Sequence, residues 1–97
     1  MKQQYLAVFE HRAGAAIGIQ FPDFPEFFSA GDTPEDALAM ALDCLKGAVE
    51  FYADNGRPLP EPSDLDAANR IIAELVAAGS VPSLHWVPVD VPAEAAV

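Results

Sequence analysis

The first run of apolar residues in the chain, residues 5–9, is short, continuous and rich in β-forming residues, and it predicts a β-strand. In residues 4–11 both alternating sets are apolar. One face of such a strand carries Tyr5, Ala7 and Phe9, and the other carries Leu6 and Val8. We therefore expect this strand to be covered, at least in part, on both faces.

Residues 12–14 supply a short turn, after which residues 16–21 alternate again and place Ile17, Ile19 and Phe21 on one side. This pattern predicts a β-hairpin. Pro22 and Pro25 then exclude regular strand pairing and predict a stiff aromatic loop. Residues 26–30 are expected to form a third strand.

A helix start follows directly, because Thr33 can cap the residues that come after Pro34, and two acidic residues fill the first turn. Apolar residues then recur at spacings of three and four. The predicted buried stripe is Leu38, Ala41, Leu42, Leu45, Ala48, Val49 and Tyr52. Asn55 and Gly56 tolerate the left-handed backbone that ends many helices, so the helix is expected to stop there.

Residues 57–62 are proline-rich and predict an extended connector. Ser63 and Asp66 resemble a capping box for a second, shorter helix. Its predicted apolar stripe is Leu65, Ala68, Ile72, Leu75 and Val76, and it ends at Gly79. In the last segment Pro82, Pro88 and Pro92 limit the expected strand to residues 83–87, at an edge of the sheet or at its ends.

These elements predict one α+β domain over residues 1–97. A three-stranded antiparallel meander is followed by a long helix, a second short helix and a final edge strand. The expected core spans residues 4–62, residues 63–91 add the second helix and the last strand, and residues 92–97 form a tail. A length of 97 residues with 52% hydrophobic side chains is enough for one packed core.

The charge adds a functional constraint. Fifteen acidic residues against five basic ones give a formal net charge of -10, which repels nucleic-acid phosphates. We expect no direct nucleic-acid binding. The same charge would steer the chain toward a basic protein, or it would serve only to keep the chain in solution. A lone Cys44, no secretory signal and no apolar run of membrane-spanning length favour the cytoplasm.

Three segments together resemble the N-terminal domain of HicB-family antitoxins: YLAVFE at residues 5–10, GIQFPDFPEFFSAGDTPEDALAMA at 18–41, and NGRPLPEPS at 55–63. The family pattern has a YxAxFE strand, a second strand ending in FPDxPG, a third leading into GDTxEEA, a long helix and a proline-rich exit. This chain departs from it at Glu26, where the family usually has glycine. The sequence VPVDVPAEAAV of residues 87–97 does not continue into the family's DNA-binding segment.

The resemblance implies a partial ribonuclease-H-like β-β-β-α fold that binds and occludes HicA, a small basic RNA-cleaving toxin. Members of the family also repress their own operon through a C-terminal DNA-binding segment. We do not expect that activity of these residues. A homo-oligomer, a dimer or higher, is expected because a short meander leaves an unpaired edge. The alternative function is an orphan oligomeric module, regulatory or structural, without a toxin partner.

For the partner surface the sequence offers aromatic candidates, since aromatic residues are enriched in interface cores. Alternation predicts that Phe21 and Phe28 lie in the core and that Phe24 or Phe27 is exposed. The expected partner-binding residues are Phe24, Glu26, Phe27 and His85. Of the neighbouring pair His85 and Trp86, Trp86 is expected to be buried.

Catalytic alternatives are weaker. Glu10, His11 and Asp23 could gather at one end of the hairpin, and a residual nuclease would have to use Glu10, Asp23 and Asp32 as metal ligands. No carboxylate lies within residues 5–9, where a nuclease would carry one on its central strand. Cys44 lies beside the helix stripe and is expected to act as a small hydrophobe. No phosphate loop, zinc pattern or nucleophile elbow occurs, so we expect no cofactor, metal or enzymatic activity.

Overall fold

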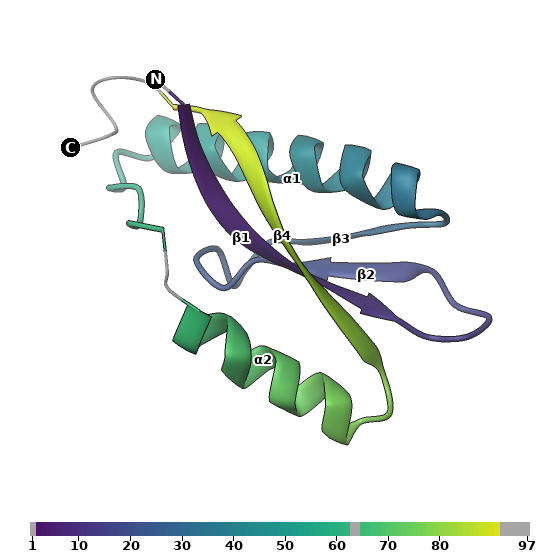
Figure 1. Cartoon of the computed structure of the whole chain (residues 1–97). Coiled ribbons are helices and arrows are strands. Elements are labelled where there is room, and N and C mark those ends of the chain that lie inside the picture. Colours follow the sequence, from purple (N-terminus) through teal and green to yellow (C-terminus); the bar gives the residue numbers. More distant parts are fainter. Residues whose placement is uncertain (1, 63–64, 92–97) are drawn as a thin grey trace.

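A computed structural model describes residues 2–62 and 65–91 of the chain. The elements are β1 (Lys2–His11), β2 (Ile17–Gln20), β3 (Phe28–Gly31), α1 (Pro34–Asp54), α2 (Leu65–Ala77) and β4 (Val81–Asp90). The four strands form one antiparallel sheet in the order β3-β2-β1-β4 (Figure 1). The predicted α+β fold, with its meander, long helix, second helix and last edge strand, is confirmed.

The last strand is longer than its prolines suggested. All ten residues of β4 pair with the ten residues of β1, from Lys2 opposite Asp90 to His11 opposite Val81. The expected limits at residues 83 and 87 are therefore wrong. Pro82 and Pro88 lie six positions apart, so both face the same side of the strand. On an edge strand the backbone nitrogens at these positions can point away from the neighbouring strand, so the missing N–H groups of the two prolines cost no hydrogen bond between β4 and β1.

A helix packs on each face of the sheet, and β1 is covered on both of its faces, as its pattern predicted (Figure 1). On the α1 side, the aromatic set of β1 packs with β2, the end of β4 and the small residues of α1. That core includes Tyr5, Ala7, Phe9, Ile17, Ile19, Phe21, Ala37, Ala41, Leu45, Ala48, Val49, Val87 and Val89. On the other side Leu6 and Val8 pack against Ala68, Ile71, Ile72 and Leu75 of α2. The sheet is thus the middle of three layers.

The start of α1 is the predicted one. The side chain of Thr33 accepts a hydrogen bond from the Asp36 amide at 3.1 Å, and Pro34 begins the helix. The buried stripe differs at three positions, because Ala37 is buried whereas Leu38 and Leu42 are exposed. Alanine on the inner face lets the helix axis approach the sheet closely, and the two leucines are left on its flank.

Both helices end in the same motif. After α1 the Arg57 amide donates to Tyr52 O at 2.9 Å, and Gly56 has a φ of 64°. After α2 the Ser80 amide donates to Leu75 O at 3.0 Å, and Gly79 has a φ of 85°. These bonds are the long bonds of Schellman caps, which require a left-handed residue and so favour glycine. The predicted ends at Gly56 and Gly79 are confirmed.

Between the helices, residues 57–62 form neither helix nor strand, as expected. The Tyr5 hydroxyl donates to Pro60 O at 2.8 Å and fixes this connector to the central strand. The proposed capping box of α2 includes Ser63, which lies outside the described residues. In the described ranges neither helix is long and apolar enough to cross a lipid bilayer.

Candidate functional site

The aromatic loop between β2 and β3 turns inward at its centre. The Phe24 amide donates to Phe21 O at 3.1 Å, and the Phe27 amide donates to Phe24 O at 3.0 Å. These consecutive tight turns place the Phe24 ring edge-on to Tyr5 and Tyr52, with centroids 4.9 and 5.2 Å apart. Phe24 is 0% exposed, so the expectation that it faces a partner is wrong.

Phe27 and Glu26 lie at the rim of the same loop. Phe27 is half-buried, and its ring contacts the exposed ring of Phe51 on α1 with centroids 5.8 Å apart. The exposed Glu26 accepts a hydrogen bond from the Tyr52 hydroxyl at 3.1 Å. That bond and burial raise the pKa of Tyr52, burial being the larger cause. Both side chains reach the surface on the α1 side of the sheet.

Phe28 is the most exposed aromatic residue of the described chain, at 71%, which overturns the prediction that it is core. Its register explains this. Phe28 pairs with Gln20 and therefore shares the face of Gln20 and Val8, opposite to α1. On that face α2 packs over β1 and β4 and does not cover β2 and β3 (Figure 1). Phe21, by contrast, is buried as predicted.

His85 lies on the α1 side of β4, half-buried, with its ring centroid 4.1 Å from that of Phe9. The Ser83 hydroxyl lies 2.9 Å from Nε2 of His85 and 2.9 Å from Nε2 of His11. Burial lowers the pKa of His85, and the neighbouring His11 lowers it further. The Ser83 hydroxyl can thus connect the two rings, donating to one ring nitrogen and accepting from the other.

Trp86 is 52% exposed, and its predicted burial is wrong. It pairs with Leu6 and so shares the face that α2 covers. The position on an edge strand leaves one side of the indole open, whereas Leu6 on the central strand is fully buried. The sequence offered no signal for this, because it depends on how far α2 extends across the sheet.

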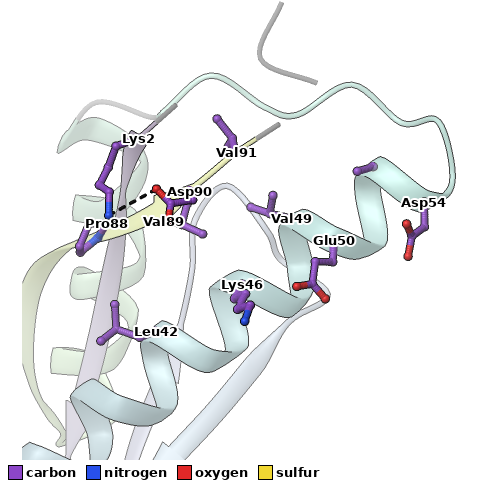
Figure 2. A pocket seen from close by; sticks show the side chains of 11 residues that line it. Lys2, Leu42, Lys46, Val49, Glu50, Asp54, Pro88, Val89, Asp90 and Val91 are labelled. Carbon is purple, nitrogen blue, oxygen red and sulfur yellow. Dashed lines mark ion pairs between the residues drawn. The ribbon is translucent and has the colours of Figure 1, made fainter. Parts of the chain in front are cut away.

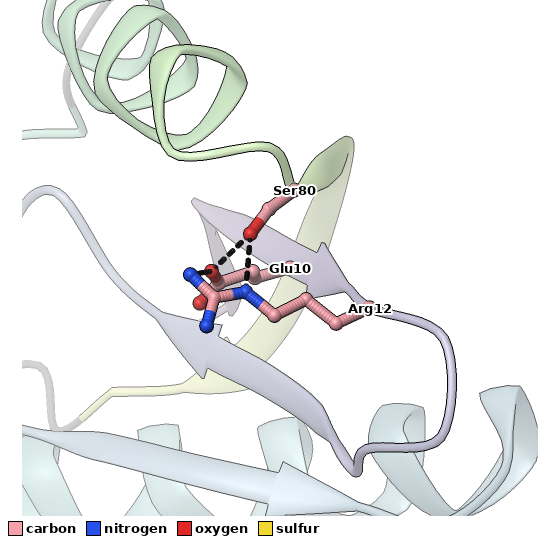
Figure 3. Close-up of polar contacts among 3 residues, drawn as sticks. All are labelled: Glu10, Arg12 and Ser80. Atoms are coloured by element: carbon pink, nitrogen blue, oxygen red, sulfur yellow. Dashed lines mark hydrogen bonds and ion pairs between the residues drawn. The ribbon is translucent and has the colours of Figure 1, made fainter.

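A polar cluster links the end of β1 to the start of β4 (Figure 3). Ser80 donates to Glu10 Oε2 at 2.5 Å and accepts from Arg12 Nε at 2.7 Å, while Arg12 Nη2 lies 3.2 Å from the same carboxylate. Each member satisfies the others, and Ser80 is buried. The cluster therefore has a structural role, because it links the β1–β2 hairpin to the turn between α2 and β4.

The carboxylates considered for a nuclease do not form a metal site. In residues 2–62 and 65–91, no group of three or more histidine, cysteine or acidic side chains is arranged to hold a metal ion. Glu10 is engaged with Arg12 and Ser80, and it is not gathered with Asp23 and His11 into a cluster of that kind. Cys44 packs half-buried at the margin of the α1 core, as predicted. Burial raises the pKa of its thiol, and the charge of Asp43 adds to the shift.

A groove of about 630 Å³ lies between the C-terminal half of α1 and the paired ends of β1 and β4 (Figure 2). Sequence reasoning did not find it, because it depends on how α1 crosses the last strand. Its charged side chains are Lys2, Lys46, Glu50, Asp54 and Asp90, and Lys2 forms an ion pair with Asp90 at 3.4 Å. With both signs present, the groove does not select an acidic or a basic ligand.

The charges are otherwise distributed unevenly along the chain. Residues 13–45, which contain β2, β3 and the first half of α1, include six carboxylates and neither lysine nor arginine. These acidic residues are Asp23, Glu26, Asp32, Glu35, Asp36 and Asp43. This third of the chain therefore presents a strongly acidic surface.

Comparison with known proteins agrees with this geometry. The sequence model of the HicB_like antitoxins of bacterial toxin–antitoxin systems matches residues 4–78. The chain belongs to the HicB-like antitoxin family. The matched residues run from β1 to just beyond α2 and include the aromatic loop and the acidic stretch.

Curated HicB antitoxins are related over the same region. The chain is 48% identical over 61 residues to Antitoxin HicB 2 of Photorhabdus laumondii, which covers 62% of this chain and 42% of that protein. It is 33% identical over 54 residues to Antitoxin HicB of Escherichia coli K12, covering 56% of this chain and 39% of that protein. The matched region thus spans less than half the length of these HicB relatives.

Solved structures of antitoxins and of a toxin–antitoxin complex share the fold. A toxin–antitoxin complex from Streptococcus pneumoniae matches with a TM-score of 0.73 and 22% identity, covering 100% of this chain and 78% of that one. The N-terminal domain of the Burkholderia pseudomallei antitoxin HicB matches with a TM-score of 0.60 and 24% identity, covering 93% and 99%. At such identities the likeness concerns the fold, and it confirms the HicB architecture.

Proposed function

We propose that this HicB-family chain is the antitoxin of a HicAB-like type II pair, which binds a small, basic, mRNA-cleaving toxin and covers its active site. The observation that carries the proposal is the acidic surface of residues 13–45 on a HicB-type domain. Such a surface attracts a basic protein, accelerates the encounter and repels RNA. The chain would therefore act by occupying the toxin and would perform no catalysis itself.

A toxin partner is supported by one of the structural comparisons. The structure from Streptococcus pneumoniae that shares the fold is described as a toxin–antitoxin complex.

The alternative, an orphan oligomeric module without a toxin, needs a surface for a second copy. Homo-oligomerisation and a cytoplasmic location stay predictions, and light scattering and cell fractionation measure them.

The direct test is co-expression with the product of the adjacent open reading frame. We expect a small basic protein that co-purifies with this chain, arrests growth when expressed alone and is neutralised when this chain is present. The complex should weaken as salt rises from about 50 mM to about 500 mM, because screening shortens the range of charge attraction. If the adjacent product neither binds nor is neutralised, the orphan module becomes the better description.

A further inference from the structure

The sheet of this domain has two edges, β3 and β4, and they differ in what they can bind. Proline is tolerated in a paired strand where its missing N–H faces away from the ladder. In β4 the outward backbone positions are therefore Pro82, Leu84, Trp86, Pro88 and Asp90. Two of these five positions have no N–H group to donate. The β4 edge is consequently closed to a long added strand.

The same alternation runs across the whole sheet, because hydrogen-bonded and non-bonded pairs alternate in an antiparallel ladder. If the even positions of β4 face outward, the even positions of β1 face β2, at the pairs of Val8 with Gln20 and Glu10 with Gly18. The odd positions of β2 then face β3, where Ile19 pairs with Ser29. The unpaired N–H and C=O groups of β3 thus belong to Phe28 and Ala30, and β3 contains no proline.

This open edge lies between exposed apolar side chains on both of its sides. Phe28 is 71% exposed and Ala30 is also exposed on the face opposite α1. On the α1 side the edge is flanked by the exposed Met40, which lines a groove of about 350 Å³ that reaches Ala30 at the edge itself. An extended segment added to β3 would gain backbone hydrogen bonds and cover apolar side chains on both faces, as in β-augmentation.

Either a second copy of this chain or a basic partner protein could add a strand to the β3 edge, and the charge of the edge favours the basic partner. The edge lies within residues 13–45, the acidic stretch that has no lysine or arginine, and Asp32 and Asp36 line the groove beside Ala30. A second copy would bring its own net charge of -10 and the same carboxylates to this edge. A basic protein would instead be attracted to it.

We propose that the basic toxin docks on the β3 edge of this antitoxin, adding an extended segment beside Phe28 and Ala30. The inference rests on the proposed function, since it assigns the surface for that partner. The added segment pairs with the backbone of both residues, packs apolar side chains on Phe28 and Met40, and presents basic side chains to Asp32 and Asp36.

Two variants of the full chain test the edge by different means. Phe28→Ser removes the exposed ring, and Ala30→Pro removes one outward N–H without removing a bond to β2. The matched control is Trp86→Ser, which removes an exposed aromatic ring from the same sheet face at the opposite edge. Titration calorimetry measures binding of the purified product of the adjacent reading frame, in a variant selected because it no longer arrests growth. Thermal unfolding verifies that each variant is folded.

We expect Phe28→Ser and Ala30→Pro each to weaken binding by about tenfold or more, and Trp86→Ser to leave it within about twofold. If wild type binds and Phe28→Ser binds equally well, the β3 proposal fails while the proposed function stands. If wild type itself does not bind, both fail. If light scattering shows a dimer that Ala30→Pro converts to monomers, the edge belongs to a second copy and the proposal is overturned.

Discussion

Gly31 of β3 lies directly against the backbone of Ala37 in α1, where a Cβ atom on the glycine would be 2.5 Å from the Cα of Ala37. No real side chain tolerates that distance, so either the helix or the strand would have to move. The contact sets the height of α1 above the sheet at the point where the helix begins. It also gives a physical reason for glycine at this place in the GDT segment that resembles the HicB family.

The substitution Gly31→Ala should therefore destabilise the domain by about 1–3 kcal/mol, because overpacking forces the backbone to shift. Gly47→Ala is the matched control. Gly47 lies on the exposed face of α1, where a Cβ would contact nothing within 4 Å, and alanine there should stabilise the helix by about 0.5–1 kcal/mol. Urea unfolding measures both. Equal effects of the two substitutions would contradict the tight contact.

Phe24 and Phe28 should differ strongly in their contribution to stability, although they lie in one sequence segment. Phe24→Ala empties a fully buried site between two tyrosine rings and should cost about 3–5 kcal/mol. Phe28→Ala removes an exposed ring and should change the free energy of unfolding by less than about 0.5 kcal/mol. Chemical denaturation of both variants provides the comparison. A large loss with Phe28→Ala would mean that the ring is covered in solution.

The stability of the domain should depend on the ionisation of His85. Burial, and then His11, lower its pKa in the folded state, whereas in the unfolded chain it lies at about 6.5. The unfolded state then binds the proton more tightly, so this contribution to stability is full above about pH 6.5 and is lost as the pH falls through the folded pKa. His85→Gln should flatten the fall in unfolding temperature between about pH 7.5 and about pH 5. Carboxylate titration is common to both proteins, and identical slopes would exclude the effect.

The prolines of β4 should protect the domain from self-association. Replacing Pro82 and Pro88 together with valine restores two outward N–H groups and leaves an edge strand of ten residues without an interruption. The double variant should form dimers or larger species at concentrations where the wild type does not. Light scattering at matched concentrations measures this. If the variant stays in the same state as the wild type, the prolines do not determine what the β4 edge binds.

Local rules predicted the elements of this chain well. Thr33, Pro34 and the two glycines Gly56 and Gly79 mark helix ends through bonds between residues close in sequence. Apolar residues on both faces of β1 predicted that both faces are covered, because that prediction does not require knowing which helix covers each face. Such signals are local, and so the sequence contains them directly.

The surface was predicted less well, because it depends on distances that no short segment encodes. Phe28 is exposed because α2 packs over β1 and β4 and does not reach β3, and Trp86 is exposed because it lies on the edge strand. Phe24 is buried because two tight turns rotate it inward. Of the expected partner residues, Glu26, Phe27 and His85 have exposed or half-buried side chains. Their role in binding stays a prediction. The length of β4 was not predicted, because proline normally ends a strand. Only the structure shows that Pro82 and Pro88 direct their nitrogen atoms away from β1.

The full pairing of β1 with β4 has a mechanical consequence. Because the two strands are antiparallel, Lys2 and Asp90 lie opposite each other at one end of the ladder. A force that separates these two residues acts across the strands, along the hydrogen bonds, and loads them one pair at a time rather than all together. The domain would therefore unzip from this end under small loads, first breaking the ion pair of Lys2 with Asp90 and last reaching His11 and Val81.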